Sequence, residues 1–491
     1  MKPKNIFTHS FSLKHLTSLR AFRYLESFSD KAYLLENVHT PRQAHSFLGV
    51  SPTKVLRIVC GRVYLEINGE CQELFEDPLV AMNRFIDEHQ MSSRMESLRG
   101  EPVYGGVVGY LGYDCVRFVE NIPMPESSVA MDDAILMLFP VSVTFEYDHE
   151  QVIITGVVID DNSRESTIAT VGALKAELER LNEIPEDLES TFLMNEVSAQ
   201  QFDEEELKTY GEVHEREHCE KVEKIKEYIR QGDIFQAVYS IRFNVPASSS
   251  ELAIYSYLKS INPSPYMFYL KLGKEVLMGA SPETLLRYDG QYLETHPIAG
   301  TRRRGRDAQD DERLSQDLLS DAKETAEHLM LVDLGRNDLS KVSKIGTVKM
   351  NRFMGIEKFS HVMHIVSVVQ GEKSDEYTPF EAMLSCFPAG TLSGAPKVRA
   401  MQIISELEKT ARGSYGGAVL FSGFSGQFDS CITIRSIYVR DKIAHIQAGG
   451  GIVADSNPKD EYQEIINKAM SPFKAIKLAN QQNSTMRGVN I

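Results

Sequence analysis

Basic residues are in the minority in this 491-residue chain, which has 53 lysines and arginines, 69 aspartates and glutamates, and a formal net charge of −16. A nucleic-acid-binding protein normally presents an excess of positive charge to the phosphates. The composition therefore argues against that class, although residues 302–306 (RRRGR) place four arginines in five positions. A nucleic-acid-binding protein that uses this arginine run remains a competing hypothesis.

Paired cysteines and long apolar runs are also missing. None of the six cysteines forms a C-x-x-C pair, which argues against a structural zinc cluster or a disulfide scaffold and suits a reducing compartment. No run of about 18 apolar residues occurs, so no transmembrane helix is expected. The N-terminus lacks the continuous apolar segment of a signal peptide. We therefore expect a cytoplasmic protein with no membrane partner.

Regular alternation of strands and helices is missing as well. Strand-like runs cover 55–67, 135–147 and 151–159, and a hairpin that ends in a glycine run is predicted over 431–451. Amphipathic helices are predicted over 217–233, 321–338, 393–408 and 456–470. Hairpins together with helices indicate an α+β fold. An acidic, polar stretch suggests a soft boundary near 190–205, which divides the chain into 1–200 and 201–491.

One short motif points to a metalloprotease. Residues 214–218 (HEREH) match the H-E-x-x-H zinc pattern on a predicted helix. His214 and His218 share a helical face with apolar Val222, and Lys221 stands where the extended metzincin pattern requires glycine. We interpret the match as a coincidence in a charged helix, and we keep a zinc protease only as a competing hypothesis.

Two acidic pairs carry more information. Glu324 and Glu327 are three residues apart on one predicted helix, and Glu461 and Glu464 repeat this spacing on the last one. This spacing places both carboxylates of a pair on one helix face. A single pair is usually a solvated surface, but two pairs together could supply oxygen ligands to Mg²⁺. Because gathered carboxylates repel, a cation is their natural counter-charge.

Anion-binding elements lie close to the last acidic pair in the sequence. Arg435 is in the predicted hairpin, and Lys468 follows on the face of the last helix. Backbone N–H groups of Gly449, Gly450 and Gly451 could converge on an anion, although a glycine run can also be only a turn. The combination predicts a small polyanionic ligand, such as a carboxylate.

Eight motifs now identify a family. In order they are GDIFQ, NPSPYMFYL, GASPETLL, PIAGTRRRG, LMLVDLGRNDL, FPAGTLSGAPKVRAM, YGGAV and QAGGGIVADS. This set resembles the chorismate-utilising enzymes, and within them the anthranilate synthase component I family of tryptophan biosynthesis, densely over 205–475 and loosely before it. The resemblance implies a large α/β sandwich with two antiparallel sheets and outer helices. The lack of any tryptophan suits an enzyme made when tryptophan is scarce.

The resemblance also implies roles for single residues. Glu327 and Glu464 would be Mg²⁺ ligands, with Glu324 and Glu461 beside them. Chorismate contacts would be Gly300, Thr301, Thr391, Tyr415, Arg435, Gly449, Gly450, Gly451 and Lys468. Glu283 would be the acid that helps the ring hydroxyl to leave, and His364 would assist the elimination of pyruvate. Without the resemblance, a capping or ion-paired Glu283 and a buried, hydrogen-bonded His364 would be the more common interpretations.

The implied reaction is the first committed step of tryptophan biosynthesis. Ammonia attacks the ring carbon beside the carboxylate of chorismate while the hydroxyl across the ring departs. Loss of the ring proton then expels the enolpyruvyl group as pyruvate and leaves anthranilate.

Two positions distinguish members of the family. Ala299 stands where para-aminating relatives commonly carry a nucleophilic lysine, and a methyl group cannot attack the ring. Gln236 stands where isochorismate and salicylate synthases place a lysine base that activates water, which ammonia does not need. Both favour anthranilate synthase, and the alternative is aminodeoxychorismate synthase component I of the folate pathway, because some of its members lack the lysine.

Partners and regulation follow from the same resemblance. No cysteine lies in a glutaminase-type nucleophile turn, so ammonia is expected from a separate glutamine amidotransferase subunit in a heterotetramer of two plus two subunits. Residues 1–200 would form a lobe with regulatory elements, and 201–491 the catalytic region. Feedback inhibition by L-tryptophan would use Glu36, Asn37, Pro265, Tyr266 and Met267. The family usually has serine at position 37, and Asn37 still offers a hydrogen-bond donor and an acceptor.

Overall fold

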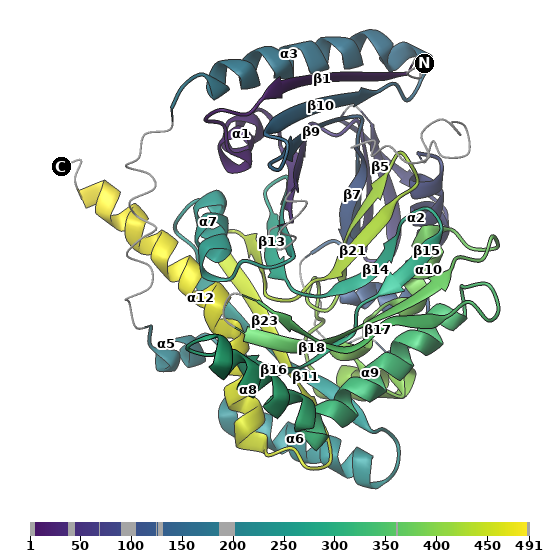
Figure 1. Cartoon of the computed structure of the whole chain (residues 1–491), viewed down its shortest axis with the longest axis vertical. Coiled ribbons are helices and arrows are strands. Elements are labelled where there is room, and N and C mark those ends of the chain that lie inside the picture. The colour runs from purple at the N-terminus through teal and green to yellow at the C-terminus, as the bar shows by residue number, and fades with distance from the viewer. Residues whose placement is uncertain are drawn as a thin grey trace.

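Two large antiparallel sheets form the centre of the protein (Figure 1). A computed structural model describes residues 5–37, 45–67, 69–89, 105–123, 125, 131–185, 202–359 and 362–488. In spatial order, the strands of the first sheet are β1 (Ile6–Ser12), β10 (Gln151–Val157), β9 (Val141–Glu146), β3 (His45–Val50), β2 (Lys31–Glu36), β12 (Tyr266–Leu272), β13 (Val276–Ser281), β22 (Ser436–Arg440), β23 (Ile443–Ile452), β11 (Gln236–Pro246) and β19 (Gly394–Ala395).

The second sheet faces the first. In spatial order it contains β16 (Ile298–Arg303), β18 (Val362–Glu372), β15 (Tyr292–Thr295), β14 (Thr284–Tyr288), β21 (Phe428–Ile432), β20 (Ala418–Gly423), β7 (Gly106–Leu111), β8 (Ala134–Phe139), β4 (Lys54–Val59), β5 (Arg62–Ile67) and β6 (Glu70–Leu74), with β17 (Lys349–Lys358) paired to β18. Tyr33 and Leu270 of the first sheet pack with Phe139 and Val419 of the second in one buried cluster. The sheets therefore share an apolar core, as in a sandwich.

Helices cover the outer faces of this sandwich. They are α1 (Ser18–Leu25), α2 (Pro78–Asp87), α3 (Arg164–Asn182), α5 (Glu204–Thr209), α6 (Glu215–Arg230), α7 (Glu251–Ile261), α8 (Ala308–Ser320), α9 (Ala322–Ser340), α10 (Pro379–Cys386), α11 (Lys397–Leu407) and α12 (Pro458–Gly488). The long helix α12 packs on β23, α6 and α7 (Figure 1). Among the described residues, none of the helices combines the length and apolarity needed to cross a membrane.

Local sequence explains where the helices form. Apolar Val222 and Ile225 recur at helical spacing in α6 and are fully buried. Asp321 caps α9, because its side chain accepts hydrogen bonds from the first backbone N–H groups of that helix. The α+β prediction and the sandwich of two antiparallel sheets with outer helices are confirmed.

The division near residue 200 does not separate two sheets. In the first sheet, β2 of the N-terminal part pairs with β12 of the C-terminal part. In the second sheet, β7 pairs in the same way with β20. The soft boundary at 190–205 falls largely on residues 186–201, which lie outside the described ranges. Each half of the chain therefore supplies strands next to those of the other half.

Candidate active site

The three glycines of the site lie inside a strand. Gly449, Gly450 and Gly451 belong to β23 and pair with β11, whereas the sequence suggested a run at a strand end with converging N–H groups. A Cβ atom at Gly449 would lie 2.8 Å from the Tyr415 hydroxyl, and one at Gly451 would lie 2.2 Å from Gln236 Nε2. The glycines are therefore needed so that these two polar side chains can approach the strand.

Replacement of Gly451 by alanine is expected to displace the Gln236 side chain. The Gln236 amide donates a 3.3 Å hydrogen bond to Glu327 Oε1, so the displacement reaches a predicted metal ligand. We expect catalytic activity to fall at least about tenfold, since misplacements of about 1 Å are costly at active sites. Steady-state kinetics would measure this, with Gly172→Ala as a control because nothing lies within 4 Å of a Cβ atom there. Full activity of Gly451→Ala would contradict the expectation.

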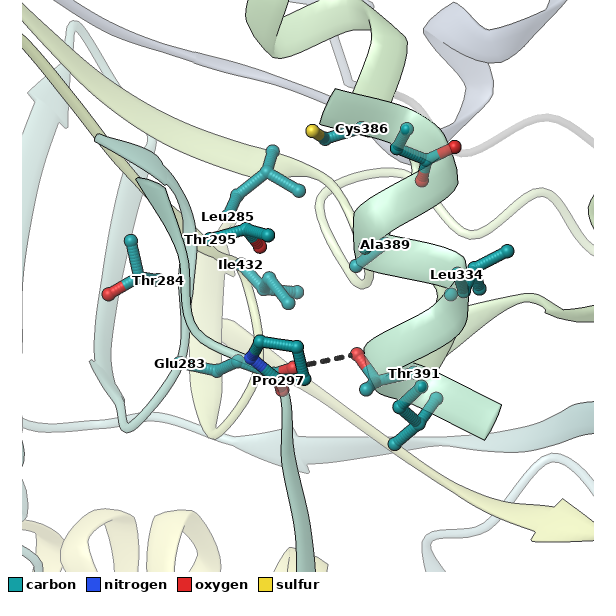
Figure 2. Close-up of a pocket in the computed structure, with 14 residues that line it drawn as sticks. Glu283, Thr284, Leu285, Thr295, Pro297, Leu334, Cys386, Ala389, Thr391 and Ile432 are labelled. Carbon is teal, nitrogen blue, oxygen red and sulfur yellow. Dashed lines mark hydrogen bonds between the residues drawn. The ribbon is translucent and has the colours of Figure 1, made fainter. Parts of the chain in front are cut away.

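Glu283 is a buried acid at a small pocket (Figure 2). Glu283 is 7% exposed, and its carboxyl accepts a 3.0 Å hydrogen bond from Thr391 Oγ1. Burial raises the pKa of Glu283 to about 8, although the Thr391 hydrogen bond and the charge of Lys468 oppose the shift. A carboxyl that keeps its proton near neutral pH can act as a general acid.

His364 is the predicted base. It lies on β18, is 8% exposed, and its Nδ1 is 2.8 Å from the Gly300 carbonyl oxygen and 3.2 Å from Thr301 Oγ1. A carbonyl can only accept, so Nδ1 carries the proton and Nε2 keeps its lone pair. Burial, together with the charges of Arg435 and Lys468, lowers the pKa of His364 to about 4. The imidazole is therefore neutral and basic at physiological pH.

Gly300 is the residue that shapes this part of β16. Its φ of +69° lies in the left-handed region that favours glycine. A Cβ atom there would also lie 2.9 Å from Leu318 and 3.2 Å from Glu324. Glycine at this position thus lets the Gly300 carbonyl reach His364.

Arg435 supplies a positive charge without a partner. Among the described residues, its guanidinium forms no hydrogen bond or ion pair, and burial alone lowers the pKa of Arg435. Its φ of +51° is also uncommon for a side-chain-bearing residue. A desolvated guanidinium with unused donors is suited to bind a carboxylate.

Lys468 lies among the acidic and basic side chains of the site. Its Nζ lies 2.6 Å from Glu464 Oε1 and 2.9 Å from the Gly449 carbonyl oxygen. The charge of Lys468 lowers the pKa of four further side chains, namely Glu283, Glu327, His364 and Glu461. The structure thus gathers the predicted acid, the predicted base and three predicted metal ligands around one ammonium.

The predicted metal ligands approach one another without forming a closed cage. Burial and the nearby charges of Glu324 and Glu464 raise the pKa of Glu327. Glu324 accepts a hydrogen bond from Arg302 at 3.3 Å. In the part of the chain that is described, no group of three or more His, Cys, Asp and Glu side chains could hold a metal by itself. Mg²⁺ takes only one or two protein carboxylates and fills its shell with water and substrate oxygens, so the donor set fits this ion.

The two specificity positions border the same groups. Ala299 is 8% exposed and pairs across β16 and β18 with Ile365, the neighbour of His364. Gln236 is 2% exposed, and its Oε1 has no partner among the described residues. The two predicted specificity positions thus hold a methyl group and an amide.

The predicted tryptophan-binding elements also come together. Met267 of β12 pairs with Glu36 of β2, and Asn37 follows at the end of that strand with its N–H bonded to a backbone carbonyl. Glu36 is 4% exposed, and its carboxylate is held by four donors: Ser18, Ser46, Tyr255 and Lys259. The Tyr266 hydroxyl, next to Pro265, bonds instead toward the second sheet.

The arginine run is paired within the protein. Arg302 contacts Asp317, Asp321 and Glu324, and Arg304 contacts Asp311 at 2.6 Å. These acids lie on or next to α8 and α9, so they neutralise much of the run. This pairing weakens the nucleic-acid hypothesis.

The HEREH segment is structural. His218 is fully buried between the rings of Tyr239 and Tyr462, at 5.6 and 5.4 Å. Burial lowers its pKa to about 4. His214, the residue before the first turn of α6, is exposed. The two histidines therefore do not share a metal-binding face.

Comparison with known proteins identifies the family of this chain. The chain matches the chorismate binding enzyme family over residues 30–474. Anthranilate synthase component 1 of Acetivibrio thermocellus is 41% identical over 470 residues, which cover 95% of this chain and 94% of that protein. The chain belongs to this family of chorismate-binding enzymes. The family membership expected from the motifs is confirmed.

Other chorismate-binding enzymes extend the comparison. Anthranilate synthase component 1 of Bacillus subtilis is 38% identical, with 96% of this chain and 92% of that protein covered. The crystal structure of anthranilate synthase component I from Streptococcus pneumoniae has a TM-score of 0.74 at 35% identity, over 89% of this chain and 93% of that chain. The isochorismate synthase MenF of Escherichia coli, at 16% identity, has a TM-score of 0.67 over 96% of this chain and 94% of that chain, and so shares the fold.

One ion pair next to the site was not predicted from the sequence of this chorismate-binding enzyme. Arg412 is 3% exposed, lies 2.7 Å from Glu408 and has its guanidinium carbon 5.6 Å from the centre of the Tyr415 ring. This contact orients the predicted chorismate contact Tyr415. The spacing of four residues between Glu408 and Arg412 was the only signal available.

Proposed function

We propose that the protein converts chorismate and ammonia to anthranilate and pyruvate with the help of Mg²⁺. The observation that carries this proposal is the gathering of buried Glu283, buried His364 and three further acids (Glu327, Glu461 and Glu464) around Lys468. An acid and a base with pKa values pushed apart suit a reaction that must protonate one oxygen and remove one ring proton.

The side chains divide the work of binding and proton transfer. Arg435 binds a carboxylate of chorismate, because its guanidinium has no ion-pair partner among the described residues. Glu283 donates its proton to the ring hydroxyl as that oxygen leaves. His364 then accepts the ring proton at Nε2, and the electrons of that C–H bond restore the aromatic ring as the ring C–O bond to the enolpyruvyl group breaks. The group leaves as the enolate of pyruvate, which takes up a proton to become pyruvate. Burial of both groups keeps bulk water away from these transfers.

Magnesium is held by carboxylates in this proposal. Glu327 and Glu464 supply oxygens, with Glu324 and Glu461 beside them. Bound Mg²⁺ supplies positive charge that neutralises and orients the ring carboxylate of chorismate. Burial and the charges of Glu324 and Glu464 raise the pKa of Glu327, and a cation among these carboxylates would offset their repulsion.

Partners and regulation complete the proposal. A separate glutamine amidotransferase subunit delivers ammonia, in an assembly of two plus two subunits, and Ala299 with Gln236 leaves ammonia as the nucleophile. L-Tryptophan inhibits by binding at Glu36, Asn37, Pro265, Tyr266 and Met267, where the end of β2 meets the start of β12. A cytoplasmic location fits the six cysteines, all of which are free thiols.

Product identification tests the proposed function. The purified protein, incubated with chorismate, excess ammonium salt and Mg²⁺ at neutral pH, where Glu283 keeps its proton, is expected to form fluorescent anthranilate and an equal amount of pyruvate. EDTA should abolish both products, and excess Mg²⁺ should restore them. Accumulation of 4-amino-4-deoxychorismate would instead support the para-aminating alternative.

A further inference from the structure

The backbone crosses from one sheet to the other at Glu283. Strand β13 of the first sheet ends at Ser281, and β14 of the second sheet begins at Thr284. Ser281 pairs with Tyr266, and Thr284 pairs with Cys431 of β21. The candidate acid is therefore carried by a short crossover whose position depends on both sheets.

Tyr266 joins both ends of this crossover. Its backbone pairs with Ser281 in the first sheet, and its hydroxyl lies 2.9 Å from Thr284 Oγ1 and 2.9 Å from Asp429 Oδ1 in the second. Because a carboxylate can only accept, the Tyr266 proton goes to Asp429 and the Thr284 hydroxyl donates to Tyr266 Oη. One side chain thus fixes the start of β14 relative to β12 and β21.

The hydrogen bonds of Tyr266 leave the Glu283 carboxyl free. Consecutive residues of an extended chain point to opposite sides. Figure 2 shows Glu283 directed toward Thr391, with the Thr284 hydroxyl on the other side of the strand. The hydrogen bond between Tyr266 and Thr284 therefore holds the backbone that orients the carboxyl of Glu283. It does not use any hydrogen-bonding atom of Glu283 itself.

We propose that Tyr266 is a positioning residue for Glu283, through its hydrogen bonds to Thr284 and Asp429. This role rests on the proposed function and adds a residue to its machinery. It differs from the tryptophan contact expected for Tyr266, because the hydroxyl bonds to Thr284, the residue that follows the acid in the chain. A general acid contributes only in the transition state, so its misplacement lowers kcat more than it changes substrate binding.

The variant Tyr266→Phe tests the proposal. It keeps the ring and removes the hydroxyl, which releases Thr284 and Asp429. We expect kcat for anthranilate formation to fall about tenfold, part of the contribution of a general acid, with KM for chorismate changed less than about twofold. The alkaline limb of the kcat profile, expected from Glu283 at about pH 8, should move to lower pH, because a looser crossover lets water reach the carboxyl.

Controls separate positioning from loss of stability. Tyr110→Phe removes another buried hydroxyl of the same core, which donates 2.9 Å to the Asp132 carbonyl, and should lower the melting temperature without moving kcat or the pH limb. Thr284→Val should lower kcat as much as Tyr266→Phe does, whereas Thr284→Ser, which keeps the hydroxyl, should keep kcat near the wild-type value. The Tyr266→Phe/Thr284→Val double variant should lower kcat no further than either single variant.

Two results would overturn the role of Tyr266. One is an unchanged kcat and pH limb in Tyr266→Phe, and the other is an equal loss of kcat in Tyr110→Phe. Wild-type protein assayed alongside shows whether chorismate is converted to anthranilate at all. A failure of the proposed function is thereby distinguished from a failure of the positioning role.

Discussion

Replacement of Glu283 by glutamine is expected to lower kcat for anthranilate formation by about 10²–10⁴-fold, the usual contribution of a general acid. Glutamine preserves the size of the side chain and can still accept the 3.0 Å hydrogen bond from Thr391, but it has no acidic proton for the leaving hydroxyl. Chorismate binding should change little, since the carboxyl acts in the transition state. Steady-state kinetics with ammonium as the nitrogen source would measure both constants.

The pH dependence of the wild-type protein should report the same group. Burial raises the pKa of Glu283 to about 8, so the proton is present below that pH and activity falls as the pH rises through it. His364, whose pKa is lowered to about 4, loses its basic form only as the pH falls through that value. A bell-shaped profile between these limits is therefore expected.

Thr391 provides a control for this assignment. Its hydrogen bond stabilises the ionised form of Glu283 and so lowers the pKa of that carboxyl. In Thr391→Val the alkaline limb should therefore move to higher pH, opposite to the shift expected for Tyr266→Phe. A Glu283→Gln variant that keeps wild-type kcat would show that the leaving hydroxyl obtains its proton elsewhere.

Local elements of this fold could be predicted from sequence because their signals are local. The apolar period in residues 217–233 predicted a helix that the structure has at Glu215–Arg230, and the turn-flanked runs at 55–67 became β4 and β5. Helix α12 extends to Gly488, well past its predicted end at 470, because the prediction followed a cap and an acidic pair only at its start. The length of this helix was the property that the sequence indicated least well.

Long-range pairing could not be predicted in the same way. Nothing in the local pattern indicates that β2 pairs with β12, more than 200 residues later, in the register Glu36 to Met267. The glycine run could equally be a turn or a strand, and the choice depends on Tyr415 and Gln236, which approach it from other segments. Such positions are decided by tertiary contacts.

The chemistry of single side chains was partly accessible. The motifs identified Glu283 and His364, but their protonation depends on burial and on hydrogen bonds to Thr391 and Gly300. The partners of Arg302 were equally hidden, because Asp317 and Asp321 follow 15 and 19 residues later in the helical segment. Charge counts alone could only make a polyanion-binding patch improbable.

Replacement of Arg435 by methionine is expected to raise KM for chorismate by about 30-fold or more, because truncation of one partner of a buried charge pair costs about 2–5 kcal/mol. Methionine retains an unbranched chain in the same left-handed backbone conformation, φ +51° in the wild type. Arg435→Lys retains the positive charge but lacks the coplanar N–H donors of a guanidinium, and it should give an intermediate KM.

The same substitution should make the folded protein more stable. Burial without an ion pair lowers the pKa of Arg435, which means that the charged form is disfavoured in the folded protein that lacks substrate. Removal of this charge should therefore raise the melting temperature while binding of chorismate weakens. A residue kept for structure would show the reverse, with a lower melting temperature and an unchanged KM, so thermal denaturation and kinetics on one variant distinguish the two roles.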